Sequence, residues 1–240
     1  MNQGRPGLFI IGTDTGVGKT LVTAALAAFL SEQGLDLGVM KPVESGESDG
    51  QDSRTLSWAA GTDDARELVA PYSFPEAVAP LLAARRQRTV IRLARLLDAL
   101  LKLTRRHEVV LVEGAGGLLC PLSASLSMAD VARAFAFPLV IVARAALGTI
   151  NHSLLTVDVA RNLGLEISGV VMCHTCQPAN LAEKTNELML KELCPTPFLG
   201  EVPFLSHLAE KGLSRGELAA LAKEHLDVPA LLKSMRLPLL

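Results

Sequence analysis

Short apolar runs recur along the chain, with helical patterns of polar and apolar residues between them. Several of these runs contain no polar residue, which is typical of parallel strands that are covered on both faces. The predicted strands are Leu8–Ile11, Leu37–Met40, Val109–Val112, Leu139–Val142, Ile167–Met172 and Phe198–Val202. The predicted helices are Lys19–Gln33, Val90–Arg106, Met128–Phe135, Ile150–Leu163, Leu181–Leu193 and Arg215–His225. This alternation predicts the α/β class, with a doubly wound, mostly parallel sheet, helices on both faces and right-handed crossovers.

Two of the predicted helices begin with capping signals. Ser214 is followed three residues later by Glu217, and Asn180 is followed in the same way by Glu183, which is the spacing of a capping box. The segment 44–88 is instead the least regular part of the chain, with Gly, Ser, Asp and several Pro residues. We expect it to form loops that contribute to function, because loops on a rigid α/β scaffold often do so.

Composition narrows the class of protein. Of the 240 residues, 49% are hydrophobic and 20% are charged, which is ordinary for a well-packed domain that needs no disulfide or metal. The net charge of −2 gives no global basic field for nucleic acid or an anionic membrane. No apolar stretch reaches the roughly 18 residues that span a bilayer, and the four cysteines are unevenly spaced. We therefore expect a cytoplasmic protein without nucleic-acid or membrane partners, in which residues 1–240 form a single α/β domain.

The strongest chemical signal is the segment Gly12 to Thr20, which follows a predicted strand and opens a predicted helix. Its glycines let backbone N–H groups turn toward phosphates, and the helix N-terminus adds free donors and a positive dipole end. Lys19 supplies a cation for the β- and γ-phosphates, and Thr20 supplies a hydroxyl for Mg²⁺. The first glycine stands one position earlier than the strict P-loop pattern, which would place it at Thr13. The alternative is a strand–helix turn without a ligand, which the Gly-Lys-Thr triplet disfavours.

Charged residues follow two further predicted strands. Glu113 comes directly after an apolar run and precedes four small residues, so we expect it to supply a metal-binding carboxylate at the edge of the sheet where ligands bind. Lys41 follows the second strand and is expected to point into the crevice beside Lys19. Two cations that face one site need an anionic ligand between them. Asp52 lies in the loop that follows, and alone it would indicate only a turn or a cap. For Glu113 and Lys41 the alternative is a solvated charge at a strand end.

These segments together resemble the dethiobiotin synthase family. The resemblance rests on five blocks in the family's order: Gly12 to Thr20, Lys41 to Gly46, Val112 to Gly117, Leu147 to His152 and Gly200 to Pro203. The family's phosphate loop has the same extended spacing, so the displaced glycine supports the resemblance. It implies a P-loop NTPase-like fold and an enzyme that joins CO₂ to 7,8-diaminononanoate with ATP and Mg²⁺. One amine becomes a carbamate, the carbamate is phosphorylated to a carbamic-phosphoric anhydride, and the second amine closes the ureido ring of dethiobiotin with loss of phosphate.

The resemblance also implies a role for each matching residue. Lys19 and Lys41 would neutralise the γ-phosphate and the carbamate oxyanion, and Thr15 and Ser45 would complete the catalytic set by hydrogen-bonding the carbamate or the diamine. Mg²⁺ would be held by Thr20, Asp52 and Glu113. The nucleotide would be bound by Asp14, Gly16, Val17, Gly18, Lys19, Thr20, Glu113, Gly116, Cys173 and Pro203. The diamine would be bound by Thr15, Lys41, Ser45, Gly148, Thr149, Ile150 and Asn151, with Asn151 holding its carboxylate tail from the other subunit of a homodimer.

Cys173 departs from the family pattern. In the family an asparagine that reads the adenine base follows the fifth strand, and the nearest residue here is Cys173. A thiol cannot offer the paired donor and acceptor of an amide. We therefore expect weaker discrimination between ATP and other nucleoside triphosphates, with base contacts falling to the backbone near Pro203.

Three other interpretations compete with this one. The Cys-x-x-Cys segment from Cys173 to Cys176 is compatible with a zinc or redox site, although no second pair of ligands lies nearby in the sequence. A nucleotide-switched partition-type ATPase, acting as a binding module, would have a similar fold. Such proteins carry a lysine early in the phosphate loop, where this chain has Asp14. A related amidoligase acting on cobyrinate-like substrates would need a fused glutaminase domain, for which the chain is too short.

Overall fold

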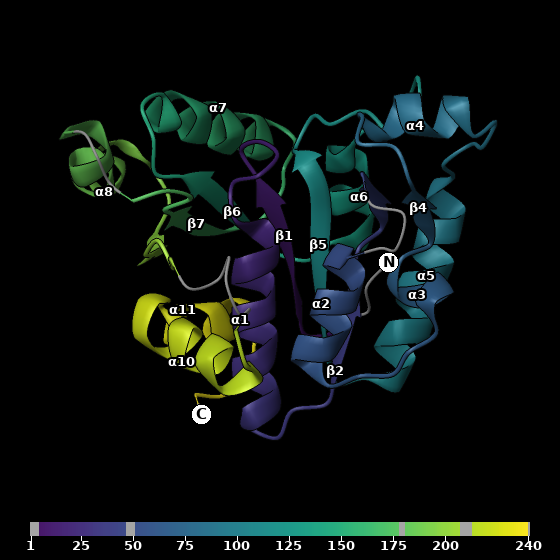
Figure 1. The fold of residues 1–240 in the computed structure, drawn as a ribbon, viewed down its shortest axis with the longest axis horizontal. Coiled ribbons are helices and arrows are strands. Elements are labelled where there is room, and N and C mark those ends of the chain that lie inside the picture. The colour runs from purple at the N-terminus through teal and green to yellow at the C-terminus, as the bar shows by residue number, and fades with distance from the viewer. Residues whose placement is uncertain (1–4, 47–50, 178–180, 207–212, 240) are drawn as a thin grey trace.

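The central sheet of the computed structural model is built from six of the apolar runs (Figure 1). The structure describes residues 5–46, 51–177, 181–206 and 213–239. The strands are β1 (Gly7–Gly12), β2 (Leu37–Met40), β5 (Val109–Gly117), β6 (Leu139–Arg144), β7 (Ile167–Cys173) and β8 (Phe198–Val202). They lie in the order β2-β5-β1-β6-β7-β8, and every neighbouring pair is parallel. The predicted parallel α/β sheet is therefore confirmed.

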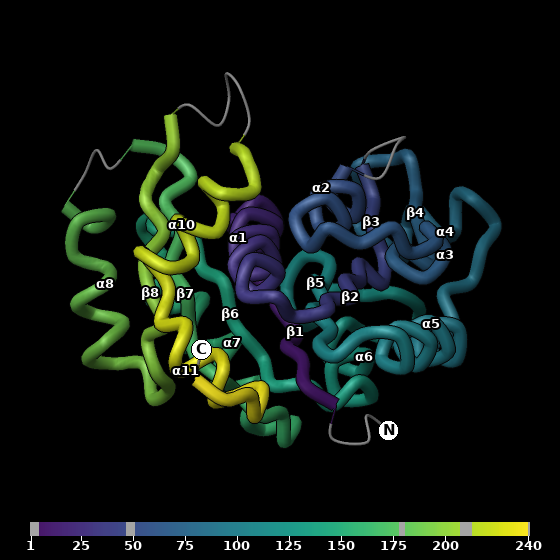
Figure 2. Tube along the Cα trace, turned by 90° about the horizontal axis from the view of Figure 1, so that it is seen from below, coloured from purple at the N-terminus to yellow at the C-terminus, as the bar shows by residue number. Residues whose placement is uncertain are grey.

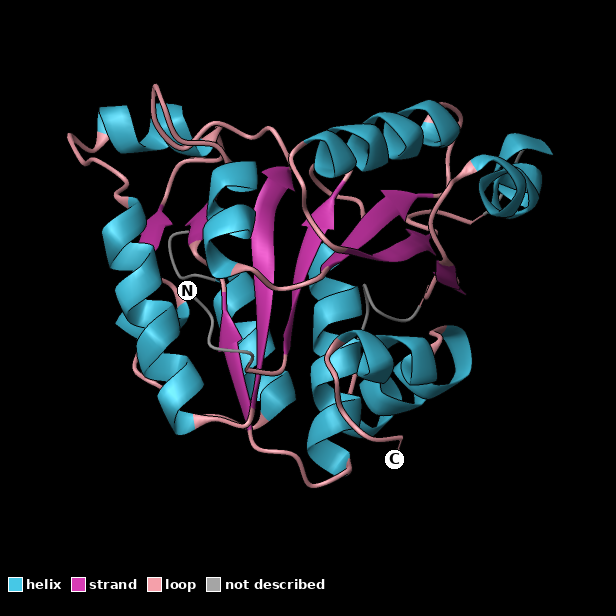
Figure 3. Ribbon diagram, turned by 180° about the vertical axis from the view of Figure 1, so that it is seen from behind, coloured by secondary structure: helices cyan, strands magenta, loops and turns pink. Residues whose placement is uncertain are grey.

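Helices cover both faces of this sheet, and Figure 3 shows the strands fanning out between them. One face packs against α1 (Lys19–Glu32), α2 (Gln51–Ala60), α10 (Arg215–His225) and α11 (Val228–Ser234). The other packs against α5 (Leu93–Arg106), α6 (Met128–Phe135), α7 (Thr149–Asn162) and α8 (Leu181–Leu193). Figure 2 shows α1 and α10 on one side of the sheet and α6 and α7 on the other.

Alternate residues of β1 show how the sheet divides the core. Phe9 and Ile11 belong to one apolar cluster, whereas Leu8 and Ile10 belong to the other. Because both faces of the strand are buried, no position favours a polar residue. This is why the strands appear in the sequence as continuous apolar runs rather than as alternating ones.

The segment 44–88 is more regular than the sequence predicts. It includes α2, α3 (Arg66–Val69) and α4 (Pro80–Arg86). A small parallel sheet is formed by β3 (Val43–Ser45) and β4 (Tyr72–Phe74). Asp52 consequently lies in the first turn of α2, and its prediction as a loop residue was wrong. The buried face of α2 is made of Ser53, Leu56, Ala59 and Ala60. Leu56 is the only large apolar residue on this face, so the sequence of α2 shows little hydrophobic periodicity.

The helix starts test the predicted caps. At Ser214 the capping box is confirmed, because its side chain accepts from the backbone N–H of Glu217 and the Glu217 carboxylate accepts from the backbone N–H of Ser214 at 2.8 Å. Asn180 lies outside the described residues. A further capping box joins Ser127 to Asp130 at the start of α6, where aspartate replaces the usual Glu or Gln. Within the described residues, none of the helices is both apolar enough and long enough to cross a membrane.

Candidate functional site

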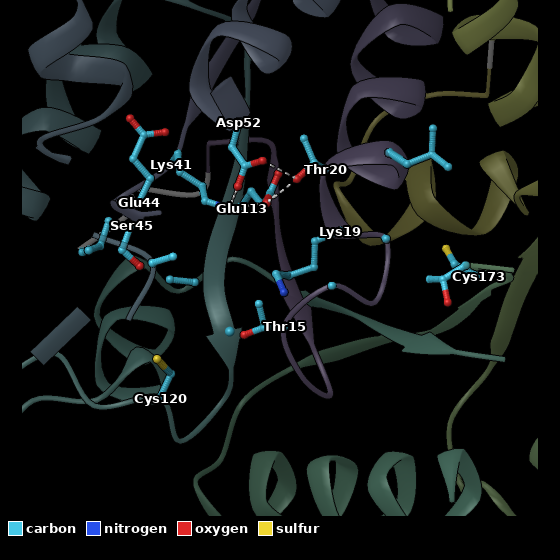
Figure 4. Close-up of a pocket in the computed structure, with 18 of the residues that line it drawn as sticks. Thr15, Lys19, Thr20, Lys41, Glu44, Ser45, Asp52, Glu113, Cys120 and Cys173 are labelled. Atoms are coloured by element: carbon cyan, nitrogen blue, oxygen red, sulfur yellow. Dashed lines mark hydrogen bonds and ion pairs between the residues drawn. The ribbon is translucent and has the colours of Figure 1, made fainter. Parts of the chain in front are cut away.

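A cavity of about 830 Å³ lies along the carboxyl ends of the parallel strands (Figure 4). Its size is typical of small-molecule sites, and this edge of an open α/β sheet is where ligands bind. The predicted site residues that line it are Thr15, Gly16, Gly18, Lys19, Thr20, Lys41, Ser45, Asp52, Glu113, Gly116, Cys173 and Pro203. The parallel topology therefore brings together residues that are far apart in the sequence.

The phosphate loop has the backbone that its glycines predict. Gly16 and Gly18 have φ angles of 70° and 100°, which residues with a side chain rarely adopt. A Cβ added at Gly18 would lie 2.9 Å from the Cβ of Cys173, so this glycine also permits the close approach of β7. Since α1 begins directly after Gly18, its first backbone N–H groups have no partners within the helix and are suited to bind an anion.

Lys19 folds back over its own loop. Its Nζ donates to the backbone carbonyl of Asp14 at 2.9 Å. Burial lowers the pKa of Lys19, and the positive charge of Lys41 lowers it further. An anion bound in the loop would favour the charged form of Lys19 and replace the carbonyl as its partner.

Four side chains converge at the start of α1, and Figure 4 shows their polar groups turned toward one another. The hydroxyl oxygen of Thr20 lies 3.0 Å from a carboxylate oxygen of Asp52 and 3.0 Å from one of Glu113. Lys41 completes the group, because its Nζ donates to Asp52 at 2.6 Å and also to Glu113. The predicted environment of Lys41 is thereby corrected: it is balanced by two carboxylates of the chain itself and does not need a ligand to do so.

Burial and charge together set the ionisation of this group. Desolvation raises the pKa of Glu113, which is completely buried, and the neighbouring Lys41 only partly opposes the shift. The same desolvation acts to lower the pKa of Lys41, but the attraction of both carboxylates outweighs it and the pKa is raised. For Asp52, desolvation is again the largest single influence, yet the attraction of Lys41 and its hydrogen bonds lower the pKa.

The oxygen atoms of this group fit a hard divalent cation. A hydroxyl and two carboxylates are ligands that Mg²⁺ prefers. The second carboxylate oxygen of Glu113, Oε2, is buried and has no hydrogen-bond partner among the described residues, so it retains the capacity to bind a cation. Within residues 5–46, 51–177, 181–206 and 213–239, no three His, Cys, Asp or Glu side chains are grouped as a metal site. Any metal held by Thr20, Asp52 and Glu113 would therefore share its coordination with phosphate oxygens and water.

Cys173 lies at the end of the cavity opposite Ser45 (Figure 4). Its side chain is only 1% exposed, and burial raises the pKa of the thiol to about 12. Cys176 is exposed, and both cysteines are free thiols. Next to Cys173, the ring of His174 is hydrogen-bonded to Glu201. Cys173 is thus a neutral packing residue beneath Gly18, with no amide to read a base.

Several predicted residues do not line the cavity. Asp14 and Val17 belong to the phosphate loop, where the Asp14 side chain accepts from the backbone N–H of Thr15 at 2.7 Å and Val17 is buried. The others, Gly148, Thr149, Ile150 and Asn151, form the start of α7. Asn151 is exposed to solvent in the single chain. Their roles stay predictions, and that of Asn151 concerns a second subunit.

The cavity also contains residues that the sequence did not mark as site residues. They are Leu21, Val43, Glu44, Ala77, Val78, Ala79, Pro80, Ala115, Cys120, His174, Thr175, Phe204 and Leu205. Glu44 was missed because it stands at the variable position of the block Lys41 to Gly46, between the matching residues Val43 and Ser45. The apolar residues gave no signal, since a cavity wall and a core position have the same composition.

Residues 6–211 match the model of a family described as an AAA domain. The chain is 38% identical over 234 residues to the ATP-dependent dethiobiotin synthetase of Bacillus licheniformis, an alignment that covers 96% of this chain and 97% of that protein. It is 40% identical over 216 residues to the ATP-dependent dethiobiotin synthetase of Anaeromyxobacter dehalogenans, covering 89% and 97%. Among solved structures, the septum site-determining protein MinD with Mg-ADP from Pyrococcus horikoshii superposes with a TM-score of 0.57 at 17% identity, over 96% of this chain and 94% of that one. At this identity the last comparison shows a shared fold alone.

Proposed function

The chain belongs to the ATP-dependent dethiobiotin synthetase family, and from this membership we propose how its cavity carries out the reaction. The enzyme uses ATP and Mg²⁺ to join CO₂ to 7,8-diaminononanoate, and it releases dethiobiotin, ADP and phosphate in biotin biosynthesis. The observation that carries the assignment to this cavity is the convergence of Lys19, Lys41 and the Thr20–Asp52–Glu113 oxygens at one edge of the sheet. The partition-type ATPase is not favoured. The MinD proteins share the fold but are only 14% and 17% identical to this chain, whereas the dethiobiotin synthetases are 38% and 40% identical.

The chemistry requires positioning and charge stabilisation rather than a protein nucleophile. The diamine takes up CO₂ as a carbamate, a carbamate oxygen attacks the γ-phosphorus as ADP leaves, and the second amine attacks the carbonyl carbon as phosphate leaves. When bound by Thr20, Asp52 and Glu113, Mg²⁺ offsets the negative charge of the nucleotide's phosphate oxygens. We assign Lys19 to the γ-phosphate, which would also be within reach of the backbone N–H donors of the phosphate loop.

Lys41, Thr15 and Ser45 are assigned to the carbamate and the diamine. The described residues use two of the three N–H groups of Lys41, which leaves one donor for an oxyanion. The hydroxyl of Ser45 donates to the backbone carbonyl of Val78 at 2.9 Å, so its lone pairs are oriented to accept from an amine. Thr15 is exposed at the rim of the phosphate loop and supplies a second hydroxyl.

The decisive experiment measures release of the nucleoside diphosphate by the purified protein with Mg²⁺, bicarbonate and ATP, with and without 7,8-diaminononanoate. We expect release that depends on the diamine, together with the ureido product detected by mass spectrometry. Release that is equal with and without the diamine would count against the ligase and in favour of a nucleotide-switched ATPase.

Nucleotide selectivity is expected to be weak. Cys173 packs against Gly18 and offers no paired donor and acceptor, so base contacts would fall to the backbone around Pro203. We predict that kcat/KM for ATP exceeds that for CTP or GTP by less than about 10³-fold, since a polar group built to hydrogen-bond the base would give discrimination of about 10⁴–10⁵. Diamine-dependent turnover with each nucleotide measures this, and a larger preference for ATP would show that another side chain reads the base.

We also propose that the enzyme is a cytoplasmic homodimer, and that residues 1–240 of each subunit form a single domain. Two leucines on the surface near Asn151 support the dimer: Leu147 is 86% exposed and Leu155 is 56% exposed. The four cysteines are all free thiols, as in a reducing compartment. Light scattering measures the mass in solution, and a monomer at the concentration of the assay would contradict the dimer.

Asn151→Ala is expected to raise KM for the diamine about 10-fold or more, because a hydrogen bond to a charged group contributes about 1.5–3 kcal/mol. KM for ATP should stay unchanged, and Asn162→Ala at the other end of α7 is the matched amide control. Mixing the Asn151→Ala and Lys19→Ala variants distinguishes the two arrangements. If Asn151 acts across the interface, mixed dimers contain one intact site and regain activity. If it acts within its own subunit, every site in the mixture stays defective.

A further inference from the structure

Glu44 is a buried carboxylate that none of the roles above uses. It lies on β3 between Lys41 and Ser45, lines the cavity and is 6% exposed. Figure 4 shows its carboxylate turned away from Thr15 and Lys19, so it does not face the phosphate loop. A charge is rarely buried without partners, and the partners of Glu44 indicate its function.

These partners lie at the start of α2 and on α3. One carboxylate oxygen of Glu44 accepts from the backbone N–H of Ser53 at 3.3 Å, and the other accepts from the Ser53 hydroxyl at 3.1 Å. Backbone N–H groups in the first turn of a helix have no partner within the helix, and a negative charge there is favoured by the helix dipole. The guanidinium of Arg66 lies 4.0 Å from the same carboxylate. Glu44 therefore fixes the first turn of α2 to β3 through both of its oxygens.

Asp52 immediately precedes Ser53 in that turn. It is the one member of the oxygen group at the start of α1 that comes from α2, and it reaches Thr20 at 3.0 Å and Lys41 at 2.6 Å. We propose that Glu44 is a positioning residue, which holds the first turn of α2 so that the Asp52 carboxylate meets Thr20 and Lys41. This inference rests on the proposed function for the role of Asp52 toward Mg²⁺. It explains why a carboxylate is buried beside the site yet directed away from the phosphate loop.

The test measures binding of a fluorescent ATP analogue at increasing Mg²⁺ concentrations, without the diamine. Residues that orient a metal ligand typically change metal affinity by about 10–100-fold. Glu44→Ala is therefore expected to raise the Mg²⁺ concentration for half-maximal binding by about 10-fold or more. Glu44→Gln retains an acceptor for the Ser53 N–H and should stay within about 3-fold of the unmodified protein. Glu67→Ala removes an exposed carboxylate from α3 and is the matched control.

Two results would overturn the positioning role. One is an unchanged Mg²⁺ dependence in Glu44→Ala, including the case in which only its thermal stability falls. The other is a rise in the half-maximal Mg²⁺ concentration in Glu67→Ala equal to that in Glu44→Ala. If Glu44→Ala does not fold, Glu44→Asp replaces it, because the shorter aspartate side chain cannot span the same distance to Ser53. An unchanged half-maximal Mg²⁺ concentration in Glu44→Asp would overturn the positioning role in the same way. Because no diamine is present, a failure of diamine-dependent ADP release by the unmodified protein would count against the proposed function and leave this measurement intact.

Discussion

Lys41→Ala is expected to lower the turnover of diamine-dependent ADP release by about 10²–10³-fold, the usual cost of removing one preorganised donor to developing charge. The Lys41 ammonium is buried and held by Asp52 and Glu113, so it is already in place before the carbamate forms. The affinity for the nucleotide should change less than turnover, because the phosphate loop and Lys19 remain. Steady-state kinetics and equilibrium binding on the same protein separate the two quantities.

The control for this variant is Lys102→Ala. Lys102 lies on α5, is paired with Asp98 and is half-exposed, so its loss should leave turnover unchanged. Lys41→Ala is also expected to lower the free energy of unfolding, because it removes the cationic partner of the buried Glu113. Turnover is therefore compared at a temperature where circular dichroism shows both variants to be folded. Turnover within a few-fold of the unmodified enzyme would remove Lys41 from the catalytic group.

Glu113→Gln is the second substitution with a large expected effect. The amide keeps the shape of the side chain but removes the negative charge from the fully buried end of the oxygen group. Since a metal ion contributes several kcal/mol of charge stabilisation in the transition state, a weakened ligand set should lower turnover by about 10²-fold or more. Titration with Mg²⁺ should recover only part of this loss, because saturation restores occupancy but not the missing ligand charge.

The matched control is Glu108→Gln, which alters an exposed carboxylate at the opposite end of β5. Its turnover and its dependence on Mg²⁺ should equal those of the unmodified enzyme. A Glu113→Gln variant that reaches full turnover at ordinary Mg²⁺ concentrations would show that the metal is held elsewhere.

The central sheet was predictable from the sequence because burial on both faces leaves continuous apolar runs. All six predicted strands are present, and their parallel orientation followed from the helices between them, whereas their order in the sheet was not predicted. The exception within the sheet is the end of β5. The predicted strand ended at Val112, but the strand continues through the small residues 114–117 to Gly117, which pairs with Gly12 of β1. Glycines that allow close approach of a ligand also allow close approach of a neighbouring strand.

The segment 44–88 was not predictable for a different reason. The start of α2 is stabilised by Glu44, a residue outside the helix, so the stabilising contact has no helical spacing in the sequence. The two strands β3 and β4 have three residues each, too few to show a period. Tertiary contacts of this kind depend on the completed fold, and only the structure reveals them.

Some residues of the candidate site were predictable from their local sequence, and others were not. Lys19 and Thr20 belong to a local motif, and Lys41 and Glu113 were found from their positions at strand ends. Asp52 came only from the family resemblance, because nothing in its immediate sequence separates a metal ligand from a turn residue. The pairing of Lys41 with both carboxylates was not foreseen, since the sequence indicated two cations at one site but not how close the acids would come.

The position of Lys41 between the two carboxylates also affects how the folded protein responds to a loss of magnesium. Asp52 and Glu113 would repel each other if they had no cation between them, and the chain supplies that cation from its own β2–β3 connection. The enzyme thus carries an internal counter-ion, and we expect it to fold without an external one. A fall in cellular magnesium should therefore stop the activity of the enzyme without causing its degradation. Activity should return when magnesium returns, without new synthesis of the protein.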